Sequence, residues 1–185
     1  MKKIVTITVL LILSVSLFAV TDSEIRSAAS TLGVAYEDLK AFVESYNNPL
    51  IAPSTEFVIQ RLSRISEIGA IQAATEDNDP NGGLNKAGSY TAAVYFESNN
   101  IDQSEFDEKD VVGKGTSCGG SIEVFSTVAD AERRNSYLGN FDGTIFASGS
   151  HRIVGTIVVR TSNDLTATQQ KNLETQIVEV LMAEK

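Results

Sequence analysis

Arg152–Thr161, with the sequence RIVGTIVVRT, has the strongest strand pattern in this chain of 185 residues. The segment is rich in β-branched residues, and apolar side chains occupy both sets of alternating positions, so both of its faces are expected to be buried. A second strand is predicted at Ser121–Ser126, with the sequence SIEVFS. The longer segment is therefore expected to lie in the centre of a sheet.

A helix is predicted between these two strands, over Val128–Phe141. Its start resembles a capping box, because Asp130 follows Thr127 at the required spacing. A strand, a helix and a second strand in this order favour a β-α-β unit, in which the strands are parallel and the crossover is right-handed.

Hydrophobic periodicity predicts further elements on both sides of this unit. They are a helix over Thr55–Ser66, strands over Gly69–Thr75 and Ser89–Glu97, a long acidic loop over residues 98–120, at most a short strand over Thr144–Ala147, and a last helix that begins at the Thr166–Gln169 capping box. The order of the elements predicts an α+β fold, with an antiparallel or mixed sheet and helices packed on one face. A ferredoxin-like arrangement is the first hypothesis for its topology.

Two short helices are predicted before this domain, over Asp22–Leu32 and Tyr36–Tyr46. Gly33 is placed to end the first helix. The segment NNPLIAPS, Asn47–Ser54, contains two prolines and is predicted to be a linker. The predicted organisation is therefore a small helical hairpin over residues 20–48, followed by the α+β domain over residues 54–185.

Residues 1–19 have the pattern of a secretory signal peptide. Lys2 and Lys3 form a positive start, an apolar run begins at Ile4, and Ala19 is the favoured cleavage position. An uncleaved membrane anchor is the alternative, although the apolar run is slightly shorter than the ~20 residues of a spanning helix. The pattern predicts export to the periplasm, the cell surface or the medium, without stable membrane insertion after cleavage.

The chain is acidic, with a formal net charge of −9 that becomes −11 when Lys2 and Lys3 are lost with the signal peptide. Binding to nucleic acid depends on Lys and Arg that neutralise phosphates, so no nucleic-acid partner is expected. Cys118 is the only cysteine in the sequence, which excludes a disulfide within the chain. The predicted partner is an unidentified component of the cell envelope or the medium.

Residues from about Thr75 to Leu181 resemble a family of small bacterial exported domains that are often carried on lipoproteins. The resemblance depends on segments such as TEDNDPNG (75–82), YTAAVYF (90–96) and SGSHRIVGTIVVRTS (148–162). This chain lacks the lipidation cysteine of the lipoprotein members. The family has no assigned activity, so the resemblance implies export and no particular chemistry.

Cys118 and His151 are the only cysteine and histidine of the chain, and they are the candidate catalytic pair. A nucleophilic pair requires a thiolate and an imidazole within hydrogen-bonding distance. In the predicted β-α-β unit, the two residues would lie at the starts of neighbouring strands. The alternative is a small buried thiol and a loop histidine. Two such residues are too few for a zinc site.

The loop Asp77–Gly88 loosely resembles the calcium-binding loop of an EF-hand. Asp77, Asp79 and Asn81 stand at the first, third and fifth positions, and Asn85 stands at the ninth. The twelfth position is Gly88 instead of a bidentate glutamate, and the flanking segments are predicted strands. Asn, Asp, Pro and Gly also form ordinary turns between strands. A weak calcium site and a simple turn are thus the two interpretations, and no other cofactor is expected.

The sequence leads to one main expectation about function, an exported, non-enzymatic binding or accessory module of unknown ligand. A small hydrolase that uses Cys118 and His151 is one alternative, and a weak calcium-binding module is another.

Overall fold

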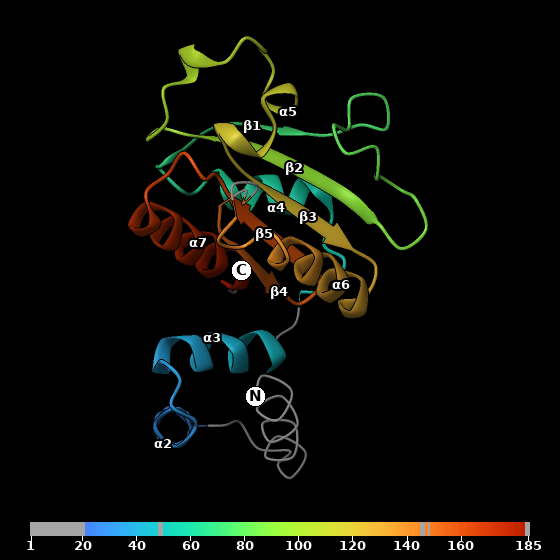
Figure 1. Cartoon of the computed structure of the whole chain (residues 1–185). Coiled ribbons are helices and arrows are strands. Elements are labelled where there is room, and N and C mark those ends of the chain that lie inside the picture. Colours follow the sequence, from blue (N-terminus) through green and yellow to red (C-terminus); the bar gives the residue numbers. More distant parts are fainter. Residues whose placement is uncertain (1–20, 48–49, 145–146, 148, 184–185) are drawn as a thin grey trace. The chain divides into compact units, whose positions relative to one another are not determined.

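The structure is a computed structural model that describes residues 21–47, 50–144, 147 and 149–183 (Figure 1). The predicted signal peptide, residues 1–19, lies outside the described residues. The chain divides into two compact units, Met1–Asn48 and Pro49–Lys185. Among the described residues, no helix has both the length and the apolar character needed to cross a membrane.

The first unit contains the helical hairpin that the sequence predicts. Its helices are α2 (Asp22–Leu32) and α3 (Tyr36–Asn47). Thr21 and Glu24 form a reciprocal capping box at the start of α2, and Gly33 ends the helix with φ of +67°. The two helices pack through a small apolar cluster of Ile25, Ala29, Leu39 and Val43.

The second unit contains an antiparallel sheet, which confirms the predicted α+β class. Its strands are β1 (Ile68–Ala73), β2 (Tyr90–Ser98), β3 (Gly119–Phe125), β4 (His151–Val154) and β5 (Ile157–Thr161). In the described part of the chain, the sheet has the order β1-β2-β3-β5-β4, and each neighbouring pair is antiparallel.

The segment RIVGTIVVRT forms a hairpin instead of one strand, so its predicted pairing was wrong. β4 and β5 pair with Val154 opposite Ile157, which leaves Gly155 and Thr156 as a two-residue turn. Gly155 has φ of +59°, as expected for glycine at the first position of a type II′ turn. The turn reverses the chain, so β5 runs antiparallel to β3 and lies between β3 and β4, which are parallel but not neighbours. The predicted unit with two neighbouring parallel strands therefore does not form. β5 is an inner strand, whereas β4 is at an edge.

The order of the elements differs from the ferredoxin-like hypothesis. That arrangement has the order β-α-β-β-α-β, which contains two split β-α-β units. Here β3, α6 (Val128–Gly139) and β4 form one such unit around β5, but β1 and β2 precede it and no strand follows α7 (Ala167–Met182) among the described residues. The antiparallel alternative of the prediction is therefore the one observed.

Helices cover both faces of the sheet. The first face carries Val94 and Ile122, and it packs against α4 (Thr55–Leu62) and α7 (Ala167–Met182). The opposite face carries Tyr95, and it packs against α6 and the short helix α5 (Val111–Lys114). The helices are therefore not confined to one face as the sequence predicted, because α5 and α6 cover the face opposite to α4 and α7. Figure 1 shows α6 and α7 as separate helices beside the β3–β5–β4 side of the sheet.

The second unit begins before the predicted boundary at residue 54. The amide of Thr156 donates to the carbonyl of Leu50 at 2.8 Å, and the amide of Ala52 donates to Thr156 Oγ1 at 2.7 Å. A Cβ atom on Gly155 would lie 2.2 Å from the same Leu50 carbonyl oxygen. Part of the predicted linker is therefore bound to the β4–β5 turn.

Candidate functional site

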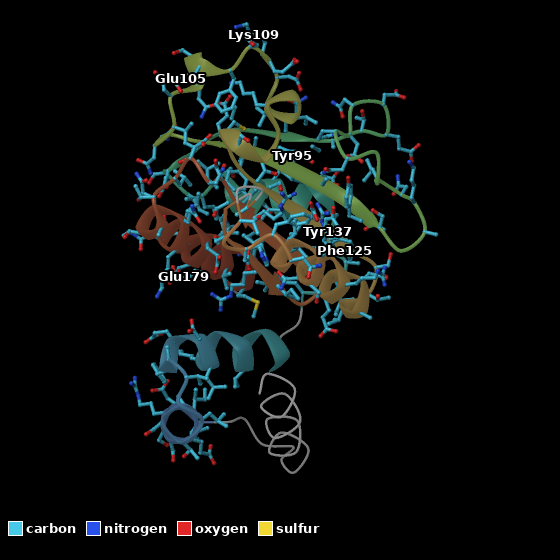
Figure 2. All side chains as sticks on the ribbon, in the orientation of Figure 1. Tyr95, Glu105, Lys109, Phe125, Tyr137 and Glu179 are labelled. Carbon is cyan, nitrogen blue, oxygen red and sulfur yellow. The ribbon has the colours of Figure 1, made fainter. Side chains whose placement is uncertain are left out.

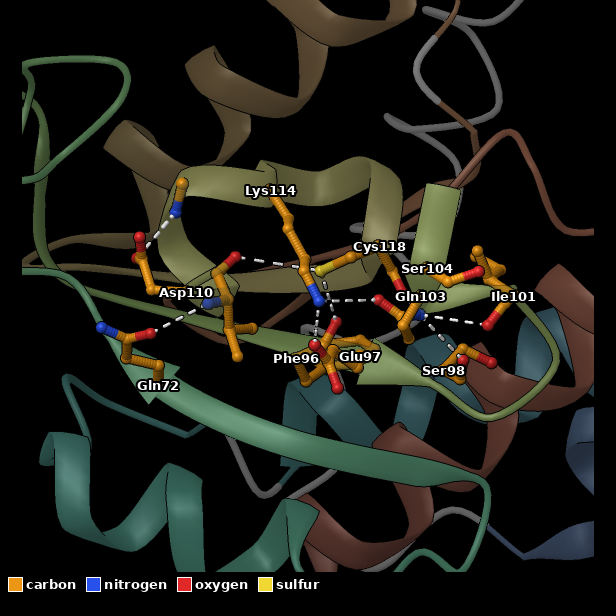
Figure 3. A network of polar contacts seen from close by, with 12 residues as sticks. Gln72, Phe96, Glu97, Ser98, Ile101, Gln103, Ser104, Asp110, Lys114 and Cys118 are labelled. Carbon is orange, nitrogen blue, oxygen red and sulfur yellow. Dashed lines mark hydrogen bonds and ion pairs between the residues drawn. The ribbon is translucent and has the colours of Figure 1, made fainter. Parts of the chain in front are cut away.

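Cys118 lies at the end of the 3-10 helix η2 (Gly115–Cys118) and is fully buried. Its thiol lies within hydrogen-bonding distance of three carbonyl oxygens, those of Gly115 at 3.2 Å, Phe96 at 3.5 Å and Val111 at 3.8 Å. Figure 3 shows the contact with Phe96. Burial raises the pKa of Cys118 to about 12, and the negative charge of Glu97 contributes to the increase. The thiolate that a nucleophile requires is therefore strongly disfavoured.

The polar groups around Cys118 connect the segment between β2 and β3 to the end of β2 (Figure 3). Lys114 Nζ donates to Glu97 Oε1 at 2.5 Å and to Gln103 Oε1 at 3.4 Å. Gln103 Nε2 in turn donates to the carbonyl of Cys118 at 2.8 Å. Because these groups bind one another, the network holds the loop in place and presents no reactive group.

His151 begins β4 and is bound to groups on and just after α6. Its Nδ1 lies 2.7 Å from Asn135 Oδ1, and its Nε2 lies 3.2 Å from Asp142 Oδ1. The strand β5 separates β4 from β3, the strand that follows Cys118, so the expected neighbouring strand starts are not observed. Both ring nitrogens have partners other than Cys118, and the structure does not bring the two candidate catalytic residues into hydrogen-bonding contact.

The loop with the EF-hand-like sequence joins β1 to β2, and Asp79 organises it. One carboxylate oxygen of Asp79 accepts the amides of Gly83 at 2.6 Å and Leu84 at 2.9 Å, and the other accepts the amide of Asn81 at 3.2 Å. The hydroxyl of Tyr90 lies 2.7 Å from both oxygens. Partial burial raises the pKa of Asp79, but the hydrogen bonds from Tyr90 and the amides outweigh it and hold that pKa below its usual value.

The other predicted calcium ligands do not converge with Asp79. Asn81 Nδ2 donates to the hydroxyl of Tyr95 at 3.2 Å, and Asn85 Nδ2 donates to Glu76 Oε1 at 2.7 Å. Asp77 is exposed. Among the residues that the structure describes, no three His, Cys, Asp or Glu side chains are grouped so that they can hold a metal ion. Backbone amides and a tyrosine surround the Asp79 carboxylate where a calcium site would place the cation.

A pocket lies between this loop and α6, on the face of the sheet that carries Tyr95. Its volume is about 350 Å³. The residues that line it come from the 75–89 loop, the starts or ends of β2 and β3, and α6: Asn81, Gly83, Gly88, Ser89, Tyr90, Phe125, Asp130, Arg133, Arg134 and Tyr137. Figure 2 labels two of the lining residues, Phe125 at the end of β3 and Tyr137 on α6. A volume of this size is typical of a small-molecule site.

Two consecutive arginines of α6 supply positive charge to the pocket. Arg133 Nη2 donates to the carbonyl of Gly88 at 2.7 Å and to Asp130 Oδ1 at 2.6 Å. Arg134 donates through Nε and Nη2 to the carboxylate of Glu123, at 2.7 Å each. Glu123 lies on β3 with a fully buried side chain, and it also accepts Arg160 Nη1 at 3.0 Å. Arg134 in the pocket wall is therefore held in place by the buried carboxylate of Glu123.

Aromatic rings supply the apolar part of the pocket. Tyr90 and Phe125 meet edge to face, with their ring centres 6.1 Å apart. Tyr137 is 54% exposed, although it is a large ring on a helix that packs against the sheet. The guanidinium of Arg134 lies 5.6 Å from the centre of the Tyr137 ring. The ring is thus held beside the pocket while its outer face remains open.

Two glycines allow the loop side of the pocket to pack closely against its neighbours. A Cβ atom on Gly83 would lie 2.7 Å from Ser89 Oγ and 3.1 Å from the Tyr90 hydroxyl. A Cβ atom on Gly88 would lie 2.9 Å from Arg133 Nη2, and Gly88 also has φ of +72°. Glycine at these positions therefore permits the close approach of the loop to β2 and α6.

Sequence reasoning did not find this pocket, because its lining comes from separate segments that only folding brings together. The pair Arg133–Arg134 was the available signal, since consecutive arginines stand out in a chain of formal charge −9.

Comparisons of the chain with protein-family models, with curated proteins and with solved structures gave no match.

Proposed function

We propose that this chain is an exported, non-enzymatic binding module, and that its ligand site is the pocket between the 75–89 loop and α6. The pocket itself is the observation that carries the proposal. It combines aromatic rings with arginine, asparagine and serine side chains, as small-molecule sites do. The sequence pattern of residues 1–19 and the resemblance to exported domains support the assignment to the periplasm, the cell surface or the medium.

Two observations favour binding over hydrolysis. The Cys118 thiol is buried among carbonyl groups, and burial raises its pKa. His151 is bound to Asn135 and Asp142. A Cys–His hydrolase requires an accessible thiolate beside the imidazole, so no observation favours that alternative. The acidic surface continues to argue against a nucleic-acid partner.

A ligand screen on the full-length exported protein tests this proposal. Small polar and aromatic compounds would be ranked by the increase in melting temperature, and hits would be repeated on Tyr137→Ala and on the control Glu132→Ala. Glu132 is exposed on the same helix and does not line the pocket. We expect hits that stabilise the wild type and the control but lose their effect in Tyr137→Ala. Hits that stabilise all three proteins equally would place the site elsewhere, and a screen without hits would count against a small-molecule module.

A further inference from the structure

We infer that the ligand of this pocket is a small organic monoanion, held through its carboxylate by the guanidinium groups of Arg133 and Arg134. This inference rests on the proposed binding function and specifies the chemistry of its ligand. It is carried by the unused hydrogen-bond donors of the pocket, by the charges around it and by its aromatic wall.

Each arginine has donors left after its contacts within the protein. Arg134 uses Nε and Nη2 to bind Glu123, and its Nη1 has no hydrogen-bond partner in the described part of the chain. Arg133 uses only Nη2, and its Nε and Nη1 are likewise without such a partner among the described residues. A guanidinium is planar and always charged, and its N–H groups match the two oxygens of a carboxylate.

The existing contacts hold both guanidinium groups before a ligand arrives. The Arg134 fork is fixed by a carboxylate that is fully buried, so its orientation is set by the interior of the protein. Arg133 is tied to the loop through the carbonyl of Gly88. Donors that are already oriented lose little conformational entropy when an anion binds.

The surrounding carboxylates limit the charge of the ligand. Asp130 lines the pocket, and Asp79 binds the hydroxyl of Tyr90, which also lines it. A second negative charge on the ligand would be repelled by these groups at short range. A carboxylate is therefore favoured over a phosphate monoester, which carries close to two negative charges at neutral pH.

The rest of the ligand is expected to be apolar or aromatic and small. The rings of Tyr90, Phe125 and Tyr137 line the pocket. Aromatic side chains bind flat apolar groups by offset or edge contacts. The volume of about 350 Å³ lies near the lower end of the range for ligand sites, so it suits a molecule of modest size or the last residue of a peptide.

Calorimetric titration of the full-length protein tests the inference with three matched probes. N-acetyltyrosine carries one carboxylate, N-acetyltyrosine amide is its neutral counterpart, and phenyl phosphate is the dianion. We expect the acid to bind with a Kd of about 1 mM or lower, and the amide and the phosphate to bind at least about tenfold more weakly. A tripeptide that ends in tyrosine, with a free or an amidated end, distinguishes a peptide terminus from a free acid as the source of the carboxylate.

Arg133→Gln is the decisive variant, and Arg26→Gln is its control. Arg133 is largely exposed, so its loss should not unfold the protein, and Arg26 is an exposed arginine of α2 that also pairs with an aspartate. We expect Arg133→Gln to weaken binding of the acid at least about tenfold and the control to leave it unchanged.

Equal binding of the acid and its amide, or binding of the acid that does not depend on Arg133, would overturn the carboxylate assignment. So would the absence of binding by every carboxylate probe. The proposed binding function fails separately, when the broad screen finds no ligand that depends on Tyr137.

Discussion

Glu123 on β3 and Arg134 on α6 form a bidentate ion pair. Nε of the arginine lies 2.7 Å from Oε2 of the glutamate, and Nη2 lies 2.7 Å from Oε1. The glutamate side chain is fully buried, and Arg160 on β5 provides its second positive partner. A buried carboxylate with two guanidinium partners joins the helix to the inner strands and sets the position of Arg134 at the pocket.

Replacement of Glu123 by alanine should strongly destabilise the protein. The change leaves Arg160 as a buried charge without its carboxylate partner on β3, and removal of one member of a buried ion pair costs about 3 kcal/mol or more. Urea unfolding followed by circular dichroism measures the loss. Glu132→Ala, at an exposed position of α6, should change the free energy of unfolding by less than about 0.5 kcal/mol. A small effect of Glu123→Ala would show that the two arginines are well solvated.

Cys118 should not react with thiol reagents in the folded protein. Its side chain is fully buried, and burial raises its pKa to about 12, so almost no thiolate is present at pH 8. We expect iodoacetamide to label the native protein negligibly over an hour and the urea-unfolded protein fully, as measured by intact mass. Rapid labelling of the native protein would show that the thiol is accessible and would support the hydrolase alternative.

Asp79→Asn should lower the stability at neutral pH and flatten its dependence on acid pH. Folding holds the pKa of Asp79 below its usual value, so the unfolded chain binds the proton more tightly. The contribution of Asp79 is therefore fully present above the ordinary carboxyl pKa of about 3.9 and is lost as the pH falls through the lower folded value. Thermal unfolding of both proteins between pH 7 and pH 2.5 would show their stabilities converge at the acid end.

The same pair of proteins tests the calcium interpretation. Because amides and Tyr90 already bind the Asp79 carboxylate, calcium at about 1 mM should shift the melting temperature little in either protein. A large increase with calcium that is absent from Asp79→Asn, and that no other divalent ion reproduces, would restore the loop as a metal site.

Arg61→Met should leave the stability unchanged or increase it. Arg61 lies on α4 with 3% exposure, and its Nη1 has no hydrogen-bond partner among the described residues. Its guanidinium lies 5.0 Å from the centre of the Phe57 ring, which offsets only part of the cost of burial. Replacement of buried ionic groups by apolar side chains of similar volume is often neutral or adds about 1 kcal/mol or more.

The exposed Arg64, just after α4, provides the control for this comparison. Arg64→Met should change the free energy of unfolding by less than about 0.5 kcal/mol. A clear loss of stability in Arg61→Met alone would indicate that the guanidinium has an essential partner.

A fragment that starts at Pro49 should fold by itself, whereas one that starts at Pro53 should be less stable. The shorter fragment loses Leu50 and Ala52, which bind the buried Thr156. Three hydrogen bonds join these residues to Thr156. Such bonds contribute about 1 kcal/mol each, so we expect a difference of about 3 kcal/mol in urea unfolding.

Thr156→Ala in each fragment checks the cause. It should destabilise the Pro49 fragment more than the Pro53 fragment, because the contacts are present only in the longer one. Equal effects would assign the stability difference to another property of residues 49–52, and a Pro49 fragment without a cooperative transition would show that the helical hairpin belongs to the same folding unit.

The sequence by itself determined the helices and most of the strands, because local periodicity and capping residues are properties of neighbouring positions. The predicted capping box of Thr166 and Gln169 forms at the start of α7, and the side chain of Thr127 accepts the amide of Asp130 at the predicted start of α6. The alternation in Ser89–Glu97 likewise predicted a strand, which the structure has as β2, Tyr90–Ser98. The acidic loop was predicted less well, since η1 (Gln103–Glu105), α5 and η2 are single turns that are too short for a periodic signal.

Only the tertiary structure decided how the strands pair and where the pocket lies. An apolar run such as Arg152–Thr161 has the same pattern as one buried strand or as two short ones, and the close contact between Gly155 and Leu50 belongs to the folded chain alone. The position of Asp79 in the sequence is compatible with a calcium loop and with a turn closed by backbone amides. Only the folded structure shows that its carboxylate accepts backbone amides. The pocket joins Gly83 and Gly88 of one loop to Arg133 of a distant helix. Such contacts depend on long-range packing, which local spacing along the chain does not encode.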